Sequence, residues 1–132
     1  MRTTCVWVMA AFAVLMAGTA LADDEAGKSL YLHYCSSCHG ESGKGDGPLA
    51  GVLQLKPADL TQLAKKSGGE LPFLELLHSI DGRSRVRGHG ETGMPVWGEV
   101  FRAPKDAPVG EQLQGAGKLL LITFYVQSLQ EK

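Results

Sequence analysis

Large apolar residues recur every three or four positions in three stretches of the chain, and this spacing predicts helices. The stretches are residues 26–34, 71–80 and 118–130, and the last, KLLLITFYVQSLQ, has the strongest pattern. A further short helix is expected from Asp59 through Lys66, because the Asp59 side chain can cap its first turn. Nothing in the pattern indicates a strand-rich sheet. The predicted fold class is therefore small and all-α.

Two stretches rich in glycine and proline separate these helices. Residues 40–51, GESGKGDGPLAG, are expected to form an irregular loop. Residues 82–110 are expected to form a long ordered loop. Long stretches without secondary structure are uncommon in compact domains unless they serve a function, so the second loop is a candidate for carrying functional residues.

The first 22 residues have the pattern of a secretory signal peptide. Arg2 supplies a positive charge, residues 6–18 are uncharged and apolar, and Ala20-Leu21-Ala22 forms an A-x-A cleavage site. We therefore expect a signal peptide over residues 1–22, a single domain over residues 23–132, and export to a periplasm. The alternative is an uncleaved membrane anchor, but the apolar run is shorter than the roughly 20 residues that a spanning helix needs.

Composition indicates a globular domain with nearly balanced charge. The 132 residues are 44% hydrophobic and 20% charged, and 13 Lys and Arg face 14 Asp and Glu for a net charge of −1. A chain of this length has room for one core. Its charge does not suggest a nucleic-acid partner.

After the leader, the chain keeps two cysteines, and these lie in the sequence Cys35-Ser36-Ser37-Cys38-His39. This C-x-x-C-H pattern is the attachment signature of c-type haem. The two thiols can reach the two vinyl groups of one porphyrin, while the adjacent imidazole is presented to the iron. Cys35 and Cys38 are thus expected to bind one haem c covalently, with His39 as an iron ligand.

Three other interpretations of the cysteines are possible. A structural zinc site usually takes four protein ligands, and no second cysteine pair is present. A thioredoxin-like site would require a βαβ pattern around the C-x-x-C. A plain disulfide is compatible with export, but it would leave His39 without a purpose.

Met94 is the only methionine after the leader, and it is the candidate for the second axial ligand. It lies between Gly93 and Pro95 in the second loop, away from any helical stripe. Ligation by His and Met is the pattern of cytochromes c. Met94 could instead fill a gap in the core. The competing ligands are three histidines: His33, His78 and His89.

In these motifs and in their order along the chain, the sequence resembles class I cytochrome c, from Gly27 to Leu129. The resemblance implies an all-α fold with crossing N- and C-terminal helices, short middle helices and long loops around one haem. Gly27 and Tyr31 would meet Phe124-Tyr125 at that crossing.

The resemblance also implies two supporting residues in the site. Gly47-Pro48 is similar to the family's turn, in which the proline carbonyl accepts a hydrogen bond from the proximal histidine, so Pro48 would orient His39. The segment from Thr92 to Gly98 is similar to the family's methionine loop, and its Trp97 would direct an indole N–H to a haem propionate. An ordinary turn proline and an ordinary core tryptophan are the alternatives.

The function implied is transfer of single electrons by Fe(III)/Fe(II) cycling, without substrate chemistry. The expected partners are redox proteins: a donor such as a dehydrogenase or a bc-type complex, and an acceptor such as a terminal oxidase. Electron-transfer encounters are typically small and transient, so no stable oligomer is required. Two alternatives are a haem enzyme or gas sensor with an open iron site, and an electron-entry subunit of a larger complex.

Overall fold

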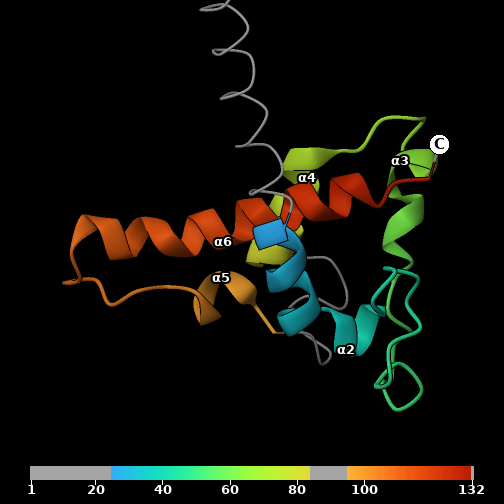
Figure 1. The fold of residues 1–132 in the computed structure, drawn as a ribbon, viewed down its shortest axis with the longest axis horizontal. Coiled ribbons are helices and arrows are strands. Elements are labelled where there is room, and N and C mark those ends of the chain that lie inside the picture. The colour runs from blue at the N-terminus through green and yellow to red at the C-terminus, as the bar shows by residue number, and fades with distance from the viewer. Residues whose placement is uncertain (1–24, 84–94, 132) are drawn as a thin grey trace, which may run out of the picture.

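The computed structural model describes residues 25–83 and 95–131, and the described part is helical without a strand. Figure 1 shows a long C-terminal helix with shorter helices packed along it. The elements in chain order are a helix over residues 25–34, α2 (Ser36–His39), the 3-10 turn η1 (Leu60–Gln62), α3 (Leu63–Lys66), α4 (Phe73–Asp81), α5 (Trp97–Val100) and α6 (Val109–Ser128).

The helix over residues 25–34 crosses α6, as the resemblance implied. A Cβ atom at Gly27 would lie only 2.5 Å from the carbonyl oxygen of Leu121, so glycine is what allows the two backbones to approach. One turn later, the Tyr31 ring packs on the Tyr125 ring with centroids 5.1 Å apart. Phe124 does not join the crossing as expected. Consecutive residues on a helix point about 100° apart, so Phe124 faces away from the crossing where Tyr125 faces into it. The Phe124 side chain is 55% exposed.

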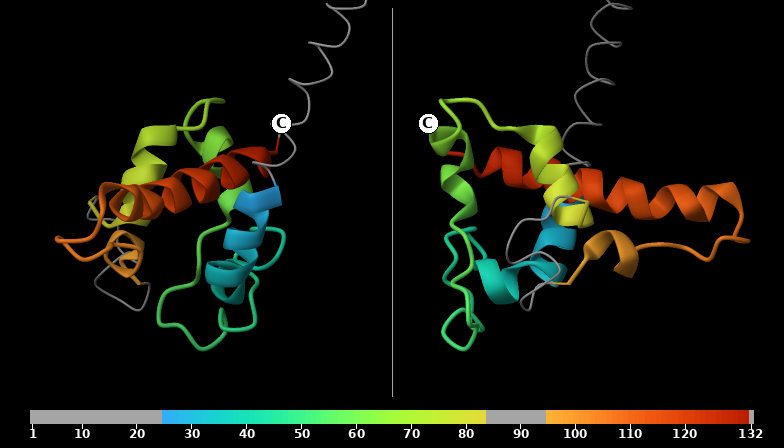
Figure 2. Two further views of the ribbon diagram at one scale, coloured as in Figure 1. Left: turned by 60° about the vertical axis from the view of Figure 1, so that its left-hand side comes forward. Right: turned by 180° about the vertical axis from the view of Figure 1, so that it is seen from behind.

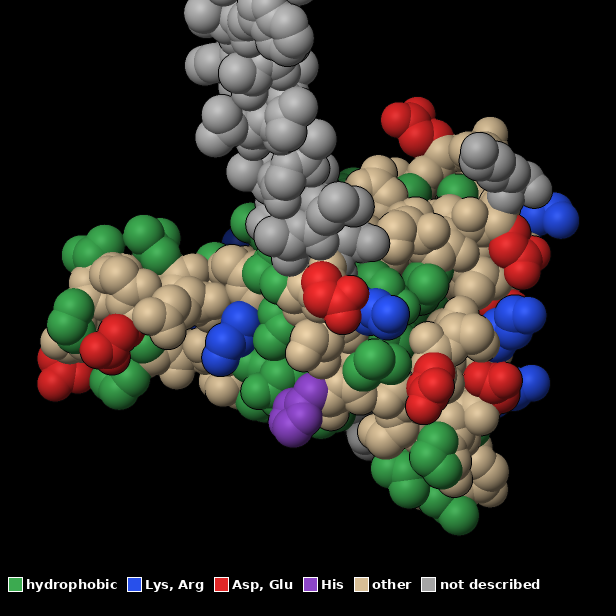
Figure 3. All heavy atoms as spheres, viewed as in Figure 1, with side chains coloured by type: hydrophobic (Ala, Val, Ile, Leu, Met, Phe, Trp, Pro, Cys, Tyr) green, Lys and Arg blue, Asp and Glu red, His purple; other side chains and the backbone are tan. Residues whose placement is uncertain are grey.

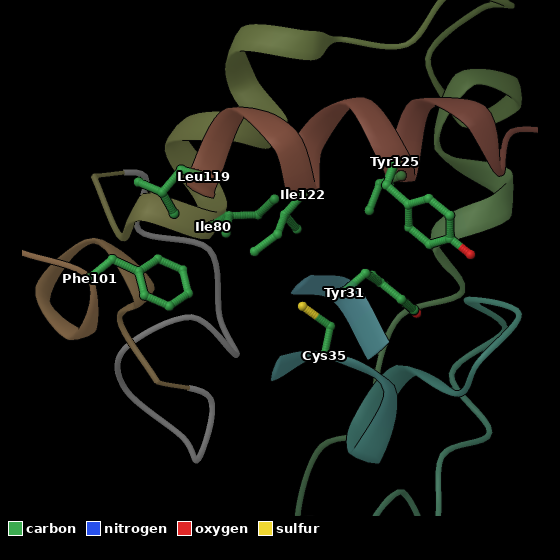
Figure 4. Close-up of a cluster of buried hydrophobic side chains, with 8 residues drawn as sticks. Tyr31, Cys35, Ile80, Phe101, Leu119, Ile122 and Tyr125 are labelled. Atoms are coloured by element: carbon green, nitrogen blue, oxygen red, sulfur yellow. The ribbon is translucent and has the colours of Figure 1, made fainter. Parts of the chain in front are cut away.

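The core lies beneath α6, where helices from distant parts of the chain converge (Figure 4). α4 packs against both α5 and α6, and α5 also contacts α6. The buried apolar cluster consists of Tyr31, Cys35, Ile80, Phe101, Leu119, Ile122, Tyr125 and Val126. On α6, Ile122 follows Leu119 by three positions, and Tyr125 and Val126 follow Ile122 by three and four, which confirms the periodicity seen in the sequence.

α6 begins nine residues earlier than the sequence pattern indicated, at Val109 instead of Lys118. The first half of α6 was not predicted because it contains three glycines, and each glycine in a helix interior costs about 1 kcal/mol relative to alanine. A tertiary contact explains one of them, because a Cβ at Gly115 would overlap the carbonyl of Phe101. The short helix α5 also lies inside the stretch that was predicted to be loop.

The C-terminal residues tie α6 to η1 and α3. The Gln130 side chain donates to the Leu60 carbonyl at 2.7 Å and accepts from the Ala64 N–H at 2.9 Å. The predicted cap of this region is confirmed, because the Asp59 carboxylate accepts from the backbone N–H and the hydroxyl of Thr61.

Figures 2 and 3 show the outside of this arrangement. The N-terminal part of α6 extends beyond the shorter helices, as the right-hand view of Figure 2 shows. Acidic, basic and apolar side chains are mixed over the face drawn in Figure 3. Within residues 25–83 and 95–131, no helix is both long and apolar enough to cross a membrane.

Candidate haem-binding site

The two cysteines and the histidine of the C-x-x-C-H motif lie on one helical turn. Cys35 continues the first helix through a hydrogen bond from its N–H to the Tyr31 carbonyl, at 2.8 Å. The N–H of His39 then donates to the Cys35 carbonyl at 2.9 Å. Both thiols are free, with Cys35 buried and Cys38 partly buried. The turn therefore presents two unbonded sulfurs and an imidazole together.

Cys35 faces the core. Its side chain is 7% exposed, and its sulfur points into the space that Ile122 and Ile80 also border (Figure 4). Burial, with a smaller contribution from nearby Cys38, raises the pKa of the Cys35 thiol to about 12. With this raised pKa the Cys35 thiol is protonated at neutral pH.

Tyr31 holds the far end of the motif in place. Its ring is fully buried, and its hydroxyl donates to the Gly40 carbonyl at 2.7 Å. Because of this burial, the pKa of the Tyr31 hydroxyl is raised far above its usual range. The crossing of the terminal helices therefore also fixes the position of the residue that follows His39.

His39 is oriented by a backbone carbonyl of the loop. Its side chain is only 5% exposed, and its Nδ1 lies 3.0 Å from the carbonyl oxygen of Ala58. A carbonyl can only accept, so Nδ1 carries the proton and Nε2 keeps the lone pair that a metal needs. Burial lowers the pKa of His39, which favours this neutral form.

The Pro48 carbonyl was expected beside His39, but the carbonyl that lies next to Nδ1 in this structure is that of Ala58. The loop turns at Gly47, which sits so close to α2 that a Cβ there would lie 2.5 Å from the carbonyl oxygens of Ser36 and Ser37. The N–H of Leu49 then donates to the Ser37 carbonyl at 2.9 Å. This tight turn leaves Pro48 at the surface. The loop comes back to the imidazole ten residues later, at Ala58.

Trp97 belongs to a small aromatic group beside the motif. Its ring stacks on Phe101 with centroids 5.5 Å apart, and Tyr34 packs edge-on against both rings at 5.4 and 4.9 Å. The indole Nε1 is buried and has no hydrogen-bond partner within the described part of the chain. A buried indole N–H normally donates to an acceptor, so we expect a hydrogen-bond acceptor beside Nε1 of Trp97.

These features fit haem c. Two free thiols and an imidazole with an available Nε2 are the groups that attach the ring and bind its iron, and the Trp97 N–H fits a propionate. Within the described residues, no group of three or more His, Cys, Asp or Glu is arranged to hold a metal ion.

Met94 and His89 lie outside the described residues, so their prediction as ligands is not addressed by the structure. The other two histidines, His33 and His78, are exposed. The role of Ala58 could not be predicted from the sequence, because every residue type has a backbone carbonyl. The place of Phe101 beside Trp97 was not predicted either, because the stretch was expected to be a loop. A signal was present, since residues four positions apart lie on the same face of a helix.

Comparison with known proteins agrees with this arrangement. The family described as cytochrome c oxidase, cbb3-type, subunit III matches residues 22–106, which is more than half of the chain. No curated relative and no solved structure matches significantly. Taken with the helical fold and the haem-attachment turn, the match shows that the chain belongs to this family and is a c-type cytochrome, a protein that binds haem c covalently and carries electrons.

Proposed function

We propose that this chain is an exported monohaem cytochrome that passes single electrons between two redox proteins. One haem c is attached through Cys35 and Cys38, with His39 and Met94 as the axial ligands. The observation that carries the proposal is the turn in which both thiols are free while the Ala58 carbonyl leaves Nε2 of His39 available. When bound, haem c supplies a one-electron Fe(III)/Fe(II) couple.

The chain's own residues then perform three tasks. His39 is held in one orientation, which keeps its Nε2 directed at one place and strengthens it as a ligand. Met94 would supply the second protein ligand to the iron, which would leave no coordination position for peroxide or oxygen. Trp97 donates its unpaired N–H to a carboxylate of the cofactor, with Tyr34 and Phe101 keeping the indole in place.

The first experiment compares visible spectra of the purified holoprotein with those of Met94→Ala, in both oxidation states. Wild-type protein should be low-spin, show the weak long-wavelength band of sulfur ligation, and not react with carbon monoxide. Met94→Ala should lose the band and bind carbon monoxide. His89→Ala and His78→Ala are matched controls that should behave as wild type. A wild-type protein that binds carbon monoxide at once would instead support a haem enzyme or gas sensor.

Export is tested by mass spectrometry of the protein from the periplasmic fraction. A mature chain that begins at Asp23 supports the cleaved leader. A full-length chain in the membrane fraction would replace the soluble carrier with a tethered one.

The family match favours a second candidate function, electron entry into an oxidase as one of its subunits. The two functions differ in how long the partner stays bound. A carrier should elute alone at physiological salt, whereas a subunit should co-purify with its oxidase. The acceptor in either case would be a terminal oxidase, and the donor a dehydrogenase or a bc-type complex.

A further inference from the structure

The carbonyl that orients His39 belongs to a chain segment that is held by the loop preceding it. The Ala58 carbonyl oxygen lies 3.0 Å from Nδ1 of His39, and the segment around Ala58 runs beside residues 43–45. The N–H of Leu60 donates to the Gly43 carbonyl at 2.7 Å, which ties the segment to the loop on one side of Ala58. The position of the Ala58 carbonyl therefore depends on residues that make no hydrogen bond to the imidazole themselves.

Gly45 lies between the backbone of His39 and this segment. Its N–H donates to the His39 carbonyl at 2.8 Å, and the residue is buried. A Cβ atom at Gly45 would overlap the carbonyl oxygen of Pro57 and would lie 3.2 Å from that of Ala58. Gly45 also has a φ of 74°, a left-handed value that residues with side chains rarely adopt. The space between His39 and the Ala58 segment is thus only wide enough for a residue without a side chain.

A side chain in place of this glycine can be accommodated by moving the Ala58 segment outward. The loop cannot move towards α2 instead, because the N–H of Gly47 donates to the Cys38 carbonyl at 3.1 Å and Gly47 already lies too close to α2 for a Cβ atom. Ala58 is exposed and Pro57 is only partly buried, so little packing opposes their displacement. The hydrogen bond between His39 and Ala58 is the contact that such a displacement would lengthen.

We propose that Gly45 is a positioning residue that sets the hydrogen bond between His39 and Ala58, and through it the reduction potential of the haem. The inference rests on the proposed binding of iron by His39, and it does not depend on which residue is the second axial ligand. An imidazole that donates a hydrogen bond from Nδ1 is a more basic ligand at Nε2. A more basic ligand stabilises Fe(III) more than Fe(II), because the higher charge attracts the lone pair more strongly. The intact hydrogen bond therefore lowers the reduction potential.

The test is the reduction potential of the purified holoprotein with Gly45→Ala. Covalent haem should be retained, because Cys35, Cys38 and His39 are unchanged. The preference of the site for Fe(III) should fall about tenfold, the lower end of what loss of an outer hydrogen bond costs a metal site, which corresponds to a rise of about 59 mV in the potential. The Nδ1 proton of His39, followed by NMR in the reduced protein, should exchange with solvent faster than in wild type.

The matched control is Gly68→Ala. Gly68 has a φ of 85°, so alanine has a similar backbone cost there, but a Cβ atom would meet nothing within 4 Å. The control should lose stability while its potential and the exchange of the His39 proton stay at their wild-type values. An equal rise in potential in both variants would show that lost stability is the cause, and it would overturn the positioning role of Gly45.

A second variant and a measurement on wild type decide the matter if Gly45→Ala does not accumulate. Gly45→Asn keeps the Cβ atom at a smaller backbone cost, because Asn adopts positive φ more often, and its potential should rise in the same way. A wild-type potential in either folded variant would overturn the role of Gly45 while leaving ligation by His39 intact. Fast exchange of the Nδ1 proton in wild-type protein would overturn the hydrogen bond, and the inference with it. A reduced wild-type protein without haem-shifted ring signals from His39 would contradict the iron ligation itself.

Discussion

At the scale of single residues, Gly27 is the clearest case of a position that the fold requires to be small. Replacing it with alanine would bring a Cβ to 2.5 Å from the backbone oxygen of Leu121, which cannot rotate away. Overpacking of this kind costs about 1–3 kcal/mol, so the melting temperature of Gly27→Ala should fall. Gly110→Ala is the control, because nothing lies within 4 Å of its Cβ. Equal melting temperatures for the two variants would contradict the observed crossing.

Asp59 makes a second prediction at this scale, on acid stability. The hydrogen bond from the Thr61 hydroxyl is the main cause that lowers the pKa of the Asp59 carboxyl. A carboxyl with a lowered pKa stabilises the fold above its unfolded pKa of about 4, and this stabilisation is lost as the pH falls through the folded value. Asp59→Asn keeps the cap but removes the charge. The melting temperature of Asp59→Asn should lie below that of wild type at neutral pH and converge with it in acid. A difference in melting temperature that stays constant with pH would show that the Asp59 charge is not the cause.

At the scale of elements, the C-terminal residues hold α6 to η1 and α3 through few but well-placed hydrogen bonds. Gln130→Ala would leave the Leu60 carbonyl and the Ala64 N–H without their partner. Unpaired groups of this kind cost about 1–3 kcal/mol, which chemical denaturation of the holoprotein should measure. Gln127→Ala, on the exposed side of the same helix, should change little. If the two variants were equally stable, the tie would have no role in stability.

At the scale of the whole molecule, the core is small, and one of its members is the haem-attachment cysteine Cys35. Small domains bury too little surface to be very stable alone, and haem adds a large apolar partner. The Cys35→Ala/Cys38→Ala variant should lose the covalent haem stain and melt without cooperativity in circular dichroism. Ser37→Ala, an exposed change inside the same motif, should retain both signals. A double variant with a normal haem stain and normal cooperative melting would contradict the proposed haem attachment.

The haem-attachment turn could be predicted from the sequence because its chemistry depends on side chains within five consecutive residues. The partner of His39 could not. A backbone carbonyl has no identity in the sequence, and the choice of Ala58 over Pro48 depends on where the loop turns against α2 at Gly47. The unpaired N–H of Trp97 could not be predicted either, because it depends on the packing of Tyr34 and Phe101 against the indole.

For the fold, the helices with a clear apolar stripe, the Asp59 cap and the all-α class could all be predicted from the sequence, since each depends on local spacing. The start of α6 at Val109 depends on packing instead, because the contact of Gly115 with Phe101 outweighs the poor helix propensity of the glycines. Packing also determines that Tyr125 is buried at the crossing while Phe124 faces outward. Local preferences specify the elements, but which residues become core depends on the faces that meet when the elements pack.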